Sequence, residues 1–92
     1  MDELIKFREE IDKIDNELVA LFEKRMGIAK RIAQYKSSKN IPIYDEAREN
    51  AVVRKNIEKL EDKSLSQELE SFYKTILELS KEVQRKVLEN SK

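Results

Sequence analysis

The sequence predicts an all-α protein with three helices per chain, paired with a second copy into an intertwined helical homodimer. Apolar residues recur at spacings of three and four over two long stretches, Leu4 to Tyr35 and Leu65 to Val87, as on one face of an α-helix. The only proline, Pro42, falls between two helical patterns. The first pattern is also too long for a compact domain of 92 residues, which indicates a partner chain.

The first helix is predicted over residues 3–38. Gly27, the only glycine, lies inside the pattern, where it costs about 1 kcal/mol relative to alanine without breaking the helix. The polar segment KSSKN and Pro42 end it, because the residue before a proline is disfavoured in the α region. Its apolar positions are Leu4, Phe7, Ile11, Ile14, Leu18, Leu21, Ile28, Ile32 and Tyr35.

The length of this helix is the argument for a dimer. At about 1.5 Å per residue it extends about 54 Å, beyond the width of a compact domain of this size. Two shorter helices cannot cover its whole apolar stripe. An antiparallel second chain would bury the remainder, so we expect a homodimer. A plain coiled coil or a three-helix bundle also fits the periodicity.

Two shorter helices are predicted over residues 45–61 and 65–89, and the chain is expected to form one domain, 1–92. Ser64 and Gln67 have the spacing of a capping box at the start of the third helix. The second helix is the least amphipathic, with inward positions Ala47, Val53, Ile57 and Leu60. The third has Leu65, Leu69, Phe72, Ile76, Leu79, Val83 and Val87.

Composition excludes several classes of function. Charged residues make up 41% of the chain, but 19 basic residues balance 19 acidic ones, so nucleic acid is not an expected partner. There is no cysteine or histidine, which removes thiolate chemistry, the commonest general base and the commonest metal ligands. No apolar run approaches the about 18 residues of a membrane helix. We expect a cytoplasmic protein without a metal or a membrane partner.

Two cations occupy the inward face of the first helix. Arg25 falls where the heptad spacing calls for an apolar residue, and a buried guanidinium needs an anion nearby. Either a structural ion pair or a bound acidic ligand would supply one. Lys36, eleven residues on, returns to nearly the same face about 16 Å along the axis. The two side chains could bracket a small dianion.

Other polar residues have suggestive spacings that are weak signals singly. Asp45, Arg48 and Glu49 fall at i, i+3 and i+4, which fits an intrahelical salt bridge or a functional cluster. Asp45 could also act simply as an N-cap. Ser80 and Gln84 lie four residues apart beside the apolar stripe of the third helix.

Four stretches together carry a family resemblance: FREEIDKIDNELVALFEKR (7–25), Lys36 after IAQY, YDEARE (44–49) and SKEVQ (80–84). Together they resemble the all-helical class of chorismate mutases, over nearly the whole chain. Each position that matches a functional residue of that family has the expected residue type: Arg8, Arg25, Lys36, Asp45, Arg48, Glu49, Ser80 and Gln84.

The resemblance implies the rearrangement of chorismate to prephenate in phenylalanine and tyrosine biosynthesis, a reaction that needs no metal or cofactor. Catalysis would rest on positioning and preorganised electrostatics. The implied catalytic residues are Lys36 and Gln84, donating hydrogen bonds to the ether oxygen. The implied binding residues are Arg8 and Arg25 on the two carboxylates, Arg48 near a carboxylate, Glu49 and Asp45 at the ring hydroxyl, and Ser80 in support.

Arg8 and Arg25 lie 17 residues apart, about 25 Å on one straight helix. They cannot grip one small ligand from the same chain, so the resemblance implies that Arg8 comes from the partner chain. We expect a monofunctional, bacterial-like enzyme without a regulatory domain of its own. The alternatives are an isochorismate pyruvate lyase on the same fold and a non-catalytic helical dimerisation module.

Overall fold

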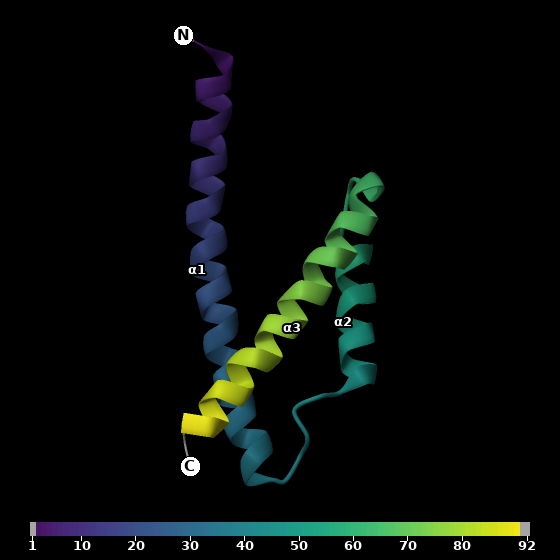
Figure 1. Cartoon of the computed structure of the whole chain (residues 1–92). Helices are drawn as coiled ribbons and strands as arrows, with labels where there is room; N and C mark the ends of the chain where they lie inside the picture. Colours follow the sequence, from purple (N-terminus) through teal and green to yellow (C-terminus); the bar gives the residue numbers. More distant parts are fainter. Residues whose placement is uncertain (1, 91–92) are drawn as a thin grey trace.

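The computed structural model describes residues 2–90. They form three α-helices, α1 (Glu3–Ser38), α2 (Glu46–Glu58) and α3 (Ser66–Asn90), and a short 3₁₀ turn, η1 (Lys63–Leu65) (Figure 1). No strand occurs in this part of the chain, so the predicted all-α fold with one long first helix is confirmed. Helix α2 is shorter than the predicted 45–61 at both ends, and α3 begins and ends one residue later than expected.

A Schellman motif ends α1. Asn40 has a positive φ of 58°, a conformation that asparagine tolerates better than most residues. The Ile41 N–H donates to the Lys36 carbonyl at 2.8 Å and the Asn40 N–H to the Ser37 carbonyl at 3.3 Å, which satisfies carbonyls left open at the helix end. Pro42 follows two residues later, so it lies in the loop that returns the chain toward α2.

The junction before α3 differs from the predicted capping box. Asp62, not Ser64, caps the turn η1, because its carboxylate accepts from the Ser64 N–H at 3.1 Å and from the Ser64 hydroxyl at 2.6 Å. These two hydrogen bonds lower the pKa of Asp62. Helix α3 then starts at Ser66, so the prediction of an N-cap at Ser64 is wrong.

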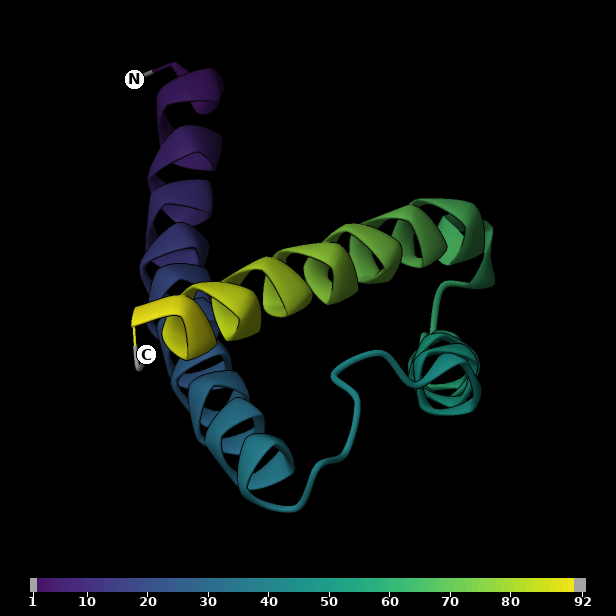
Figure 2. The same cartoon turned by 60° about the horizontal axis from the view of Figure 1, so that its bottom comes forward.

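Helix α3 crosses the C-terminal half of α1, and α2 lies along the other side of α3 (Figures 1 and 2). The buried apolar residues are few: Met26, Ala29 and Ala33 on α1, and Val52 on α2. The small alanines let α3 approach α1 closely. Ala47, predicted to face inward, is exposed, because the face of α2 that meets its neighbours is the one carrying Val52.

The N-terminal half of α1 extends away from the other helices (Figure 1). As a result, the Cα radius of gyration of the chain is 16.7 Å. A compact domain of this length has a radius of gyration of about 12 Å. The predicted apolar stripe of α1 is therefore uncovered within one chain. Its members are 44 to 62% exposed: Leu4, Phe7, Ile11, Ile14, Leu18, Leu21, Ile28, Ile32 and Tyr35.

Candidate active site

A cavity of about 300 Å³ lies between the C-terminal half of α1, the start of α2 and the C-terminal half of α3. The apolar part of its wall includes Ile28, Ile32 and Leu77. Seven of the eight residues singled out in the sequence line this cavity: Arg25, Lys36, Asp45, Arg48, Glu49, Ser80 and Gln84. Arg8 does not line it. Residues from three separate parts of the sequence are thus gathered around one small volume.

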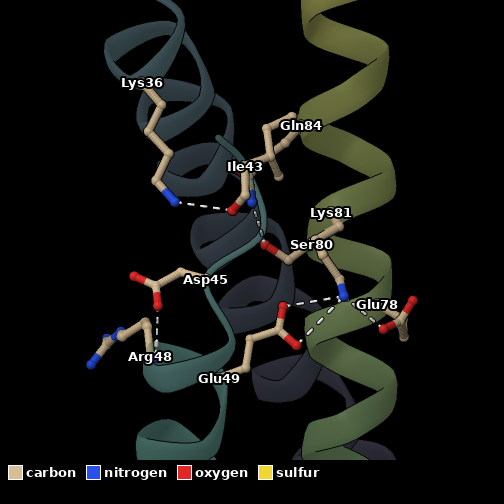
Figure 3. A network of polar contacts seen from close by, with 9 residues as sticks. All are labelled: Lys36, Ile43, Asp45, Arg48, Glu49, Glu78, Ser80, Lys81 and Gln84. Atoms are coloured by element: carbon tan, nitrogen blue, oxygen red, sulfur yellow. Dashed lines mark hydrogen bonds and ion pairs between the residues drawn. The ribbon is translucent and has the colours of Figure 1, made fainter. Parts of the chain in front are cut away.

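Helix α1 contributes Arg25 and Lys36. The Lys36 ammonium donates a hydrogen bond to the Ile43 carbonyl at 3.0 Å, so the loop after α1 fixes this side chain at the cavity (Figure 3). Arg25 is half-buried and forms no ion pair with any residue among 2–90. A structural ion pair at Arg25, one of the two alternatives left open by the sequence, is therefore not found in the described chain.

The start of α2 contributes the acidic residues and one more arginine. Asp45 precedes the helix as its N-cap, and its carboxylate accepts from the Arg48 backbone N–H at 3.0 Å, which satisfies an open donor of the first turn. The Arg48 guanidinium is in no ion pair within the described residues. The triplet of Asp45, Arg48 and Glu49 is therefore not an intrahelical salt bridge.

Helix α3 contributes Ser80 and Gln84, which are 7% exposed each. The Gln84 amide nitrogen donates to the Ser80 hydroxyl at 3.1 Å, and the Gln84 carbonyl oxygen is buried without a hydrogen-bond partner in residues 2–90. Burying such an oxygen unpaired costs about 1–3 kcal/mol. The amide is therefore satisfied locally on one side only, and a bound molecule could complete it.

Lys81 is a cavity residue that sequence reasoning missed. Its side chain is 10% exposed, and its ammonium lies 3.2 Å from Glu49 and 2.8 Å from Glu78 (Figure 3). The hydrogen bond with Glu78 is the main cause of the raised pKa of Lys81, and the same bond lowers the pKa of Glu78. The sequence did indicate that Lys81 shares a helix face with the other cavity residues of α3. Leu77, Ser80, Lys81 and Gln84 follow the helical spacing of three and four.

The charges that line the cavity favour an anionic ligand. Four cations face two carboxylates: Arg25, Lys36, Arg48 and Lys81 against Asp45 and Glu49. Glu49 pairs with Lys81, and Asp45 caps α2. Neither carboxylate forms an ion pair with Arg25, Lys36 or Arg48. These three cations remain without a carboxylate partner among residues 2–90.

Arg8 lies on the projecting half of α1, where its side chain is exposed. It is 17 residues from Arg25 on the same uninterrupted helix, a separation of about 25 Å. Its own chain therefore cannot bring it to the cavity.

Residues 2–90 contain neither a metal-binding cluster nor a membrane-spanning helix. No group of three or more histidines, cysteines, aspartates or glutamates is arranged to hold a metal ion. None of the helices combines the length and the apolar character needed to cross a bilayer.

Comparison with known proteins supplies the family. The family model for chorismate mutase type II matches residues 7–85. A chorismate mutase of Methanocaldococcus jannaschii is 26% identical over 92 residues, covering 99% of this chain and 93% of that protein. A bifunctional chorismate mutase/prephenate dehydratase of Aquifex aeolicus is 44% identical over 55 residues, and the T-protein of Haemophilus influenzae is 37% identical over 54.

The last two matches cover 60% and 59% of this chain but only 15% and 14% of those longer proteins. No solved structure matches the chain with comparable significance.

Proposed function

We propose that this chain, which belongs to the chorismate mutase type II family, rearranges chorismate to prephenate in the cavity between α1, α2 and α3. Membership of this family makes the chain an isomerase in aromatic amino-acid biosynthesis. One observation carries the assignment of the site: three cations without carboxylate partners and a half-satisfied buried amide line a single small cavity. We also propose that residues 1–92 form one catalytic domain.

The reaction that the family resemblance implies is unimolecular. An ether C–O bond of the dianionic substrate breaks while a C–C bond forms, so substrate and product are isomers. No proton carrier or nucleophile is required. The protein has to hold a folded conformer and stabilise the negative charge that grows on the ether oxygen.

Lys36 and Gln84 are proposed to donate hydrogen bonds to that oxygen. The Lys36 ammonium has three donors, and the Ile43 carbonyl uses one of them. Rotating the Gln84 amide by a half turn would let its oxygen accept from the Ser80 hydroxyl and free its nitrogen for the substrate. That rotation pairs the oxygen that is now buried alone, which gives Ser80 its supporting role.

The remaining residues are proposed to bind the substrate. Arg25 and the partner's Arg8 would each hold one carboxylate, because a guanidinium binds a carboxylate through two parallel hydrogen bonds. Arg48 would add positive charge near a carboxylate. Glu49, with the Asp45 region, would accept a hydrogen bond from the ring hydroxyl.

A homodimer is part of this proposal, and two features support it. The apolar stripe of α1 is exposed from Leu4 to Tyr35. Such a contiguous exposed apolar surface indicates an interaction site, unlike apolar residues scattered singly over a surface. An apolar notch of about 400 Å³ also lies between α1 and α3, lined by Val19, Phe22 and Phe72 among others, with Arg25 at its edge. An antiparallel second chain laid along α1 would cover the stripe and bring its Arg8 toward Arg25.

Assays on the purified protein test the function. Prephenate formed from chorismate supports it, whereas salicylate and pyruvate formed from isochorismate, without activity on chorismate, would identify the lyase alternative. A helical dimerisation module without catalysis predicts no turnover of either compound. A cytoplasmic location stays a prediction.

A further inference from the structure

Lys81 is the cavity cation to which the family resemblance assigns no role. Its ammonium lies 3.2 Å and 3.5 Å from the two carboxylate oxygens of Glu49 on α2. Lys81 therefore contacts both carboxylate oxygens of Glu49. Each carboxylate oxygen has further lone pairs, so Glu49 can accept a ligand hydroxyl without leaving Lys81.

Lys81 also fixes the segment that leads into α2. Its ammonium sits over the ring of Tyr44, 4.6 Å from the ring centroid, a distance at which a cation is attracted to the aromatic face. Tyr44 directly precedes Asp45, the N-cap of α2. One side chain of α3 therefore contacts both the first turn of α2 and the loop before it.

A second ion pair on α3 shows what is unusual about Lys81. Lys74 and Glu70 are also joined at 2.8 Å, but their side chains are 65% and 46% exposed, and such a surface pair contributes little. Lys81 is 10% exposed. Burying an ammonium is costly unless it is well paired, so a lysine at this position needs a carboxylate partner.

The reason to restrain Glu49 lies in its surroundings. Arg25, Lys36 and Arg48 line the same cavity without carboxylate partners among residues 2–90. An unrestrained glutamate would be attracted to one of these cations, since opposite charges a few Å apart attract strongly in a partly buried site. That cation would then be lost to an anionic substrate.

We propose that Lys81 is a positioning residue that holds Glu49 at the cavity wall and keeps it from pairing with the cations that bind the substrate. The proposal rests on the proposed function, because it takes the substrate to be a dianion whose ring hydroxyl meets Glu49. Lys81 acts through Glu49, so its contribution depends on Glu49 being ionised and in place.

A double-mutant cycle tests this. Lys81→Met raises KM for chorismate about tenfold, the scale of one charge-assisted hydrogen bond, with a smaller loss in kcat because Lys36 and Gln84 are untouched. In a Glu49→Gln background, Lys81→Met changes KM less than about twofold, because no carboxylate is left to hold. Lys81→Arg, which keeps the cation, stays near the wild-type KM.

The matched controls remove ion pairs that do not restrain Glu49. Lys74→Met and Glu78→Gln leave KM and kcat unchanged, although Glu78→Gln removes the shortest ion-pair contact of Lys81. Circular dichroism establishes that each variant is folded. Should Lys81→Met not fold, Lys81→Gln takes its place in the cycle.

Equal KM increases from Lys81→Met in the two backgrounds would overturn the proposal, as would Lys81→Arg behaving like Lys81→Met. Turnover of chorismate by the wild type is measured first. A wild type without that activity refutes the proposed function, whereas an active wild type with additive losses refutes only the role of Lys81.

Discussion

A shared active site makes a quantitative prediction for mixed dimers. Arg8→Ala and Arg25→Ala chains should each be inactive alone, because every site in either homodimer lacks one carboxylate clamp. Losing one partner of a buried charge pair costs about 2–5 kcal/mol, which corresponds to about 30- to 5,000-fold in kcat/KM. Mixed dimers differ, since one of their two sites receives Arg25 from one chain and Arg8 from the other.

The size of the recovery follows from the geometry. Arg8 is about 25 Å from Arg25 along α1, so in the proposed shared site Arg8 would have to come from the partner. Random exchange of equal amounts makes about half of the dimers mixed, and half of the sites in a mixed dimer carry no substitution. Prephenate formation should therefore recover to about a quarter of the wild-type rate per chain in the exchanged mixture, and to about half in purified mixed dimers.

The assay needs proof of exchange and a matched control. Chains carrying different affinity tags are unfolded together, refolded and purified through both tags in turn. The control mixes Lys36→Ala with Arg25→Ala; both residues line the cavity of a single chain, so every site in these mixed dimers stays defective. Purified mixed dimers without recovery, or equal recovery in the control, would refute the shared site.

Three further outcomes are expected. Lys36→Ala should lower kcat by about 10²-fold or more, the scale of one oxyanion-hole donor; near-normal single-turnover rates would remove Lys36 from the mechanism. Gln84→Glu should be active at low pH and lose activity as the pH rises, because only a protonated carboxyl donates to the ether oxygen; a flat pH–kcat profile would contradict that role. Gly27→Ala should stabilise the protein by about 0.5–1 kcal/mol, since an added Cβ meets nothing within 4 Å; a lower urea midpoint at fixed protein concentration would indicate that a second chain packs there.

The helices were predictable from the sequence because they depend on local periodicity, whereas most of the cavity residues were identified through the family resemblance. A spacing of three and four defined α1 and α3, and the same rule placed Arg25 and Lys36 on one face. What periodicity cannot do is choose between adjacent faces. On α1 the face with Met26, Ala29 and Ala33 packs against α3, while the more apolar stripe beside it stays open.

The sequence-based predictions failed at the cap before α3 and at Lys81, where the structure depends on which of several groups a side chain contacts. Asp62 outcompetes Ser64 as a cap because its carboxylate reaches two donors of Ser64 at once. Lys81 was passed over because a lysine in a helix is usually exposed. Spacing along α3 places Lys81 on the same face as Ser80 and Gln84, but its contact with Glu49, 32 positions away in the sequence, cannot be inferred from spacing within one helix.

Within residues 2–90, no large side chain is completely enclosed by its own chain. In the proposed homodimer, folding and association would be one equilibrium, and stability would depend on how much protein is present. Diluting the enzyme would erode its structure as well as its activity, and the melting temperature would climb with each tenfold increase in concentration. The amount that a cell synthesises would itself set how much of the catalyst is folded.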